Sequence, residues 1–263
     1  MSQDLNDLLD GWPHEPGQIK VRKIMGSDGQ EKVQLRLDLG LIQMEMKGRP
    51  DGQRPKGYES LLTFHQHRAR AAEETDETYK LSAEDCGELQ QEGIQYYHRY
   101  LSLFQLEDFP SVVRDTQRNL DLFAFVRAHT EREDITWAFD QFIPYVLMMN
   151  TRAKASVELE KKSLDAALKE IDKGRELITS FYAEHEQNDA AEKSAELSFL
   201  DEWREELKAK RPMSKLDKMR REMQSAIEHE AYERAAQLRD EIKALDAKRQ
   251  KRVQTRAAAD SDE

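Results

Sequence analysis

The feature that most constrains this chain is a pair of short amphipathic stretches between residues 215 and 245. In each stretch apolar residues recur at steps of three and four, which places their side chains on one face of an α-helix. The first stretch carries Leu216, Met219, Met223, Ala226 and Ile227, and the second carries Tyr232, Ala235, Leu238, Ile242 and Leu245. The intervening residues 229–231 lack an apolar anchor, so the pattern predicts an αα-hairpin. A hairpin of about thirty residues is too small to bury a self-sufficient core, and we expect it to pack against another surface.

The second stretch has the side chains that a helix-on-helix contact requires. Ala235 and Ala236 are small enough for another helix to approach closely, and the larger apolar residues around them supply knobs. Arg239 and Asp240 are expected at the rim, where charge sets orientation and partner choice. Burying four or five such side chains contributes roughly 1.5–3 kcal/mol each, before ordering costs. The alternative is that this stripe packs against the chain's own preceding helices.

Residues 232–242 resemble a known sequence family. They read Tyr-Glu-Arg-Ala-Ala-Gln-Leu-Arg-Asp-Glu-Ile, which is similar to the UVR motif, a helical hairpin shared by the B and C subunits of the bacterial nucleotide-excision nuclease. The family pattern is roughly Phe-Glu-x-Ala-Ala-x-Leu-Arg-Asp-x-Ile, so Tyr232 keeps an aromatic side chain and adds one hydroxyl. The same motif occurs in some Clp-type chaperone subunits and in activators of protein-arginine kinases. The residues that match are Glu233, Ala235, Ala236, Leu238, Arg239, Asp240 and Ile242.

The resemblance implies protein–protein interaction without catalysis, through pairing with another UVR hairpin or a helical partner protein. It implies two contexts, namely nucleotide-excision repair with the B or C nuclease subunit, and quality control with a Clp-type chaperone or arginine-kinase system. The kinase activators carry metal-binding cysteine pairs, whereas Cys86 is the only cysteine here. A homodimer through paired hairpins is a further arrangement. The expected partner-binding residues are Met219, Met223, Tyr232, Glu233, Ala235, Ala236, Leu238, Arg239, Asp240, Ile242 and Leu245.

Composition and charge limit the other functions. Hydrophobic residues make up 38% of the chain and charged residues 35%, which suits solvent-exposed helices better than a thick central sheet. The net charge of −11 argues against general nucleic-acid or membrane binding by the body of the protein. Residues 211–256 differ from the rest of the chain in the sign of their charge. They contain 13 Lys or Arg and 8 Asp or Glu, so their net charge is +5, and the net charge of the remaining residues is −16. Weak, salt-sensitive nucleic-acid binding through this basic end is therefore an alternative function.

The sequence offers no catalytic constellation, so we expect no enzymatic activity, cofactor or metal site. His65 and His67 are two residues apart and would point to different faces of a helix. Cys86 lies on an apolar helical face, which is typical of a buried small hydrophobe. Tyr96, Tyr97 and Tyr100 could stack on bases, but their acidic surroundings favour core packing.

A cytoplasmic protein is the expectation from the remaining sequence signals. A single cysteine cannot form an intrachain disulfide. The longest apolar run, residues 142–149, is too short to span a bilayer and contains Pro144. The acidic start of the chain lacks the apolar segment of a signal peptide.

The chain outside the hairpin predicts a mainly α-helical fold with a small N-terminal antiparallel β meander, an α+β arrangement. Residues 18–47 alternate apolar and polar side chains around Asp28-Gly29, a strong hairpin-turn signal. Such a small sheet needs to lay one face on helices. The expected organisation is an N-terminal arm at 1–16 that docks through Trp12 and Leu8-Leu9, a meander and loop at 17–57, a helical body at 58–210, the UVR hairpin at 213–250 and a flexible tail at 251–263.

The helical body shows several boundaries. Ser82-Ala83-Glu84-Asp85 resembles a capping box that opens a long helix. Phe109-Pro110-Ser111 breaks and restarts the chain, and Pro144 either kinks a helix or starts its successor. Helix pairs with small residues such as Gly174 at their crossings partly resemble tetratricopeptide repeats, a second protein-binding architecture, although no clean 34-residue period is present.

The loop at residues 48–57 is rich in turn formers and carries Arg49, Arg54 and Lys56. It is either an anion-binding loop or a solvated connector between the sheet and the first long helix. Its glycine spacing matches neither a dinucleotide fingerprint nor a P-loop, which favours the connector.

Overall fold

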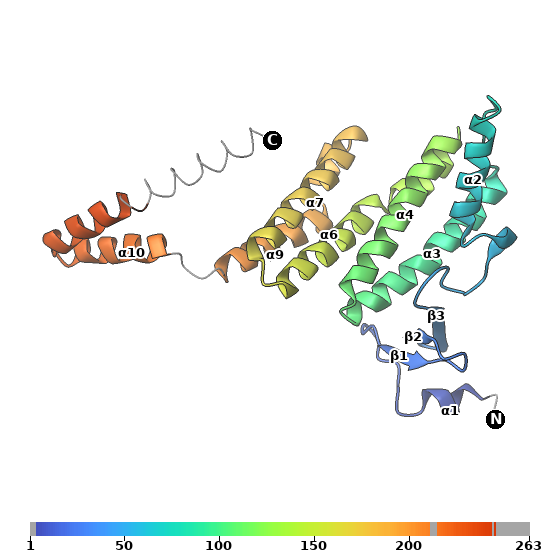
Figure 1. Cartoon of the computed structure of the whole chain (residues 1–263), viewed down its shortest axis with the longest axis horizontal. Coiled ribbons are helices and arrows are strands. Elements are labelled where there is room, and N and C mark those ends of the chain that lie inside the picture. The colour runs from blue at the N-terminus through green and yellow to red at the C-terminus, as the bar shows by residue number, and fades with distance from the viewer. Residues whose placement is uncertain (1–3, 211–214, 244, 246–263) are drawn as a thin grey trace. The chain divides into compact units, whose positions relative to one another are not determined.

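The computed structural model describes residues 4–210, 215–243 and 245. The chain divides into two compact units, residues 1–207 and residues 208–263. Figure 1 shows a three-stranded sheet and a row of helices in the first unit and a helical hairpin in the second. The expected α+β composition with a small sheet is confirmed.

The sheet is an antiparallel meander of β1 (Val21–Met25), β2 (Glu31–Leu37) and β3 (Gly40–Glu45), in that order. Asp28-Gly29 lies in the β1–β2 turn, where Gly29 has a φ of +73° that a side chain would strain. Val33 pairs with Met44 across the sheet, and both pack with Leu35 into a core shared with helical residues. The predicted meander and its helix-covered face are confirmed.

The described part of the N-terminal arm contacts the sheet. It contains the one-turn helix α1 (Leu5–Leu9), followed by Trp12. The guanidinium of Arg22 lies 4.1 Å from the centroid of the Trp12 ring, and Nε of Arg36 donates to the Trp12 carbonyl at 3.0 Å. The expected docking through Trp12 is therefore confirmed, whereas Leu8, also expected to dock, is 55% exposed.

The remaining elements before residue 210 are helices, and their most extensive contacts join α3, α4, α6 and α7 in that order. α3 packs on α4, α4 on α6 and α6 on α7, and Figure 1 shows these helices side by side. A tetratricopeptide-like arrangement stays a prediction. The elements are η1 (Pro55–Gly57), α2 (Leu61–Glu73), α3 (Ala83–Gln105), α4 (Phe109–His129), α5 (Glu133–Asp140), α6 (Ile143–Glu160), α7 (Leu164–Glu184), α8 (Asn188–Ala191) and α9 (Ala195–Ala209).

The helix boundaries follow the sequence signals. Ser82 and Asp85 form a reciprocal capping box at the start of α3, as predicted. The side chain of Asp108 caps α4 by accepting from the backbone N–H of Ser111, and Pro110 occupies the first turn of α4. Pro144 also lies in a first turn, so it starts α6 instead of kinking a longer helix.

A small residue lets α7 approach α6. A Cβ atom built on Gly174 of α7 would lie 2.7 Å from Cβ of Thr151 on α6, well inside van der Waals contact. We expect Gly174→Ala to lower the free energy of unfolding by about 1–3 kcal/mol, because overpacking outweighs the gain in helix propensity. Thermal unfolding followed by circular dichroism measures this.

Gly87 on α3 provides the matched control, since a Cβ there meets nothing within 4 Å. Gly87→Ala is expected to raise stability by about 0.5–1 kcal/mol. Adding Thr151→Ala to the Gly174→Ala variant removes Oγ1 and Cγ2 of Thr151, which lie closer still to the new Cβ, but keeps Cβ of residue 151, so it should restore only part of the loss. Equal effects of the two glycine substitutions would contradict the tight crossing.

The second unit is the predicted αα-hairpin. Its first helix is α10 (Lys215–Glu228), and its second covers residues 232–243. The chain turns at residues 229–231, where Glu230 has a φ of +58° and the N–H of Ala231 donates to the Ala226 carbonyl at 2.8 Å. The flexible tail expected at 251–263 lies outside the described residues.

Candidate functional site

The facing sides of the two hairpin helices close on each other. Met219 of α10 forms a cluster with Leu238 and Ile242 of the second helix, and Met223 and Leu245 pack against this cluster. Leu238 is only 2% exposed, the lowest value in the cluster. These predicted residues therefore hold the hairpin together, and Ala235 is buried beside them in the second helix.

The outward side of the second helix carries the other predicted residues. Tyr232 is 66% exposed, although tyrosine has a large apolar ring. Tyr232, Ala236 and Asp240 follow each other at steps of four, so they share one face of the helix. Nε of Arg239 donates to the Asp240 carboxylate at 3.0 Å on the surface, and Glu233 is exposed as well.

The eleven predicted residues therefore all belong to the hairpin, but they form an inner group and an outer group. The inner ones pack between the two helices, and the outer ones are exposed. Ile227, which the predicted set leaves out, is also 42% exposed near the turn. Its place on the apolar stripe of the first stretch is a signal that could have included it in the set.

Residues 214–248 match the family model described as the UvrB/uvrC motif. The chain carries a UVR motif. The predicted resemblance of residues 232–242 to the UVR motif is thereby confirmed, and the match extends over both helices of the hairpin. The motif covers a small part of the 263 residues and carries no information about the helical unit. No curated protein and no solved structure matches the chain.

The loop that contains Arg49 is tied into the helical unit. Nε of Arg49 lies 3.1 Å from a carboxylate oxygen of Glu92, and Nη1 of Arg49 lies 3.4 Å from a carboxylate oxygen of Asp51. Arg49 is therefore paired with carboxylates, while Arg54 and Lys56 face solvent. This pairing favours a structural connector over an anion-binding loop.

The histidines and the cysteine occupy ordinary structural positions. Nδ1 of His65 lies 2.6 Å from the Tyr79 hydroxyl, whereas Nδ1 of His67 lies 3.2 Å from the Tyr58 hydroxyl. Cys86 is buried, as expected, and burial raises the pKa of its thiol. Among the described residues, no group of three His, Cys, Asp or Glu side chains could hold a metal ion. In the same part of the chain, no helix is long and apolar enough to cross a membrane.

Proposed function

We propose that the chain is a non-enzymatic adaptor whose UVR hairpin docks onto a helix pair of a partner protein. The observation that carries the proposal is the UVR match at residues 214–248, in a hairpin that belongs to a separate compact unit. The cluster inside the hairpin contains three buried apolar side chains among the described residues. Such a core is small for an independent unit, and a partner helix would add apolar burial.

Docking would use the outward face of the second helix. The Tyr232 ring gains burial on contact, which contributes roughly 1.5–3 kcal/mol for a large apolar side chain. Ala236 allows close approach of a partner helix because it has no side chain beyond Cβ. Arg239 and Asp240 would set the orientation from the rim. Two hairpins meeting in this way form a four-helix contact.

The partner class follows from the motif. The first candidate is the UVR hairpin of a B or C subunit of the nucleotide-excision nuclease, and the second is a Clp-type chaperone or arginine-kinase system in protein quality control. Both place the protein in the cytoplasm. Homodimerisation is the arrangement in which the partner hairpin belongs to a second copy.

Nucleic-acid binding through the hairpin is less well supported by the described charges. Arg234 lies 4.0 Å from Glu222, and Arg239 is paired with Asp240. Acidic side chains therefore interleave with the basic ones, whereas a phosphate-binding surface gathers basic side chains on one face. Binding that survives moderate salt would favour this alternative.

A direct test uses purified proteins and calorimetric titration. The full chain is titrated with UVR hairpins from the nuclease B and C subunits and from Clp-type chaperone subunits of the same organism, and light scattering measures self-association. We expect one of these hairpins to bind the full chain and not to bind a truncated chain of residues 1–210. The substitution Tyr232→Ala in the full chain should weaken this binding about tenfold. Equal binding by residues 1–210 would overturn the assignment to the hairpin.

A further inference from the structure

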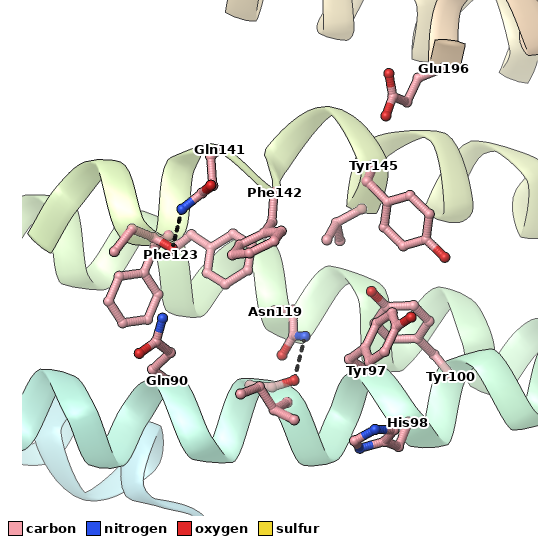
Figure 2. A pocket seen from close by; sticks show the side chains of 15 residues that line it. Gln90, Tyr97, His98, Tyr100, Asn119, Phe123, Gln141, Phe142, Tyr145 and Glu196 are labelled. Carbon is pink, nitrogen blue, oxygen red and sulfur yellow. Dashed lines mark hydrogen bonds between the residues drawn. The ribbon is translucent and has the colours of Figure 1, made fainter. Parts of the chain in front are cut away.

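A pocket of about 570 Å³ opens in the helical unit and contains no residue of the UVR hairpin. Its walls come from α3, α4, α5 and the start of α6, and Glu196 of α9 also lines it. Figure 2 shows the side chains gathered in two parts, with Tyr97, Tyr100 and Tyr145 on one side and Phe123 and Phe142 on the other.

Three tyrosines form the first part of the pocket. The ring centroids of Tyr97 and Tyr100 on α3 are 5.6 Å apart with perpendicular planes, and those of Tyr97 and Tyr145 are 6.3 Å apart with planes tilted by 54°. The rings therefore make a corner instead of a flat stack. Burial raises the pKa of both Tyr100 and Tyr145, so these phenols are neutral at physiological pH. Neutral aromatic faces attract cations through their quadrupoles at centroid distances up to about 6 Å.

The charge around this corner is negative. In the part of the chain that the structure describes, Glu196 is the one Asp, Glu, Lys or Arg that lines the pocket. It is half-buried and close enough to Tyr145 that its charge helps to raise the pKa of that phenol. Burial lowers the pKa of His98, another lining residue, so this imidazole adds no positive charge at neutral pH.

The wider surroundings have the same sign. Residues 1–207 contain 26 Lys or Arg against 41 Asp or Glu, a net charge of −15. The charge of Arg152 lowers the pKa of Tyr145, but this arginine does not line the pocket. Its guanidinium lies over the rings of Phe104 and Phe199, at 4.4 and 4.5 Å from their centroids. The pocket therefore favours a positively charged ligand.

The second part of the pocket is apolar and open to solvent. Phe142 is 49% exposed and Ile94 is 41% exposed, although both are large apolar side chains. Phe123 and Phe139 lie below them, with ring centroids 5.8 Å apart in an edge-to-face contact. This half can bury an aliphatic or aromatic side chain.

We propose that this pocket binds a basic peptide segment of a partner protein. A Lys or Arg side chain enters the tyrosine corner beside Glu196, and an adjoining apolar side chain fills the phenylalanine half. A peptide fits better than a small cation, because the volume lies within the range of sites for ligands much larger than one ammonium group. This interaction is separate from UVR docking and would give the chain a second binding surface.

The test begins with a bead-bound library of acetylated hexapeptide amides, randomised without cysteine and screened with the full chain. We expect the selected peptides to carry Lys or Arg next to an apolar residue. In titrations of a selected peptide, norleucine in place of lysine keeps the chain length and removes the charge, and should lower the affinity about tenfold. Selection without any preference for Lys or Arg would overturn the proposal.

Two variants locate the peptide in the pocket. Glu196→Gln and Tyr97→Leu should each lower peptide affinity about tenfold, because one removes the carboxylate and the other an aromatic wall. Trp137→Leu and Tyr232→Leu are matched controls at exposed aromatic residues outside the pocket, and should leave peptide binding unchanged. Glu196→Gln changes no core residue, so it remains informative if Tyr97→Leu unfolds. Unchanged affinity in Glu196→Gln would contradict the proposed site.

Discussion

Replacing both Leu238 and Ile242 with aspartate is expected to abolish UVR-partner binding while residues 1–207 stay folded. Both positions lie in the small cluster between the hairpin helices, and burying an unpaired carboxylate costs several kcal/mol. The hairpin should therefore lose its helical structure, and partner affinity should fall at least about 100-fold. Titration against the UVR hairpin that binds the wild-type chain measures this loss, and circular dichroism measures the helix content.

The helical unit should keep its thermal unfolding in the same variant. Its two described hydrophobic clusters contain residues of 1–207 and none of the hairpin. Ser225→Asp with Gln237→Asp is the matched control, because both residues are exposed hairpin positions and the added charge is the same. Undiminished partner binding without hairpin structure would contradict docking by the folded hairpin. Unfolding of the whole chain would show that the hairpin belongs to the core.

The elements of the fold that depend on neighbouring residues could be predicted from the sequence. Alternation around Asp28-Gly29 identified the meander, because a strand reverses its side-chain direction at every residue. Ser82 and Asp85 identified the start of α3, because both partners of a capping box lie within one turn. Pro144 left two alternatives open, since proline fixes its own backbone but does not determine where the preceding helix ends.

The apolar stripe of the UVR hairpin could be predicted, but not its partner. Helical spacing places Leu238 and Ile242 on one face of their helix and Met219 on one face of α10. It does not reveal whether each face meets the other helix of the hairpin or a second protein. The structure shows that these three residues meet one another, and that Tyr232 lies outside this contact.

The aromatic pocket could not be predicted, because its residues come from distant segments. Tyr96 and Tyr100 are buried, as the expectation of core packing requires. Tyr97 lies between them in sequence but is 37% exposed, and it lines the pocket together with Tyr100, and with Tyr145 and Glu196 from later helices. The packing of α3 on α4 and of α4 on α6 brings Tyr97 and Tyr145 together, and Glu196 reaches the same pocket from α9.

The buried ion pairs that connect the loop at residues 48–57, α2, α3 and α4 could not be predicted from the sequence either. Arg99 of α3 makes two hydrogen bonds to Asp115 of α4, at 2.7 and 2.9 Å, and both residues are almost fully buried. Nη1 of Arg99 also donates to the carbonyls of Glu45 and Gly48, which fixes the end of β3 and the loop after it. A high content of charged residues suggests a solvated surface, and only tertiary packing shows which charges are enclosed.

Glu92→Met is expected to destabilise the helical unit strongly. Glu92 is fully buried on α3 and accepts hydrogen bonds from the backbone N–H groups of Leu61 and Leu62, at 2.8 and 3.2 Å, in the first turn of α2. The same carboxylate pairs with Arg49 and Arg118. Its removal leaves the largely buried Arg118 guanidinium and two backbone N–H groups without their carboxylate partner, which costs about 3–5 kcal/mol. The melting temperature should fall by about 10 °C or more, measured by calorimetry.

Glu88→Met is the matched control, because Glu88 is an exposed glutamate one turn earlier on the same helix, and its replacement should change stability by less than about 0.5 kcal/mol. Adding Arg118→Met to Glu92→Met removes one of the unpaired cations and should recover part of the loss. Burial already lowers the pKa of the Arg118 guanidinium, so this arginine depends on Glu92 to remain buried as a cation. If Glu92→Met melted like Glu88→Met, the carboxylate would not be the group that joins α2 to α3.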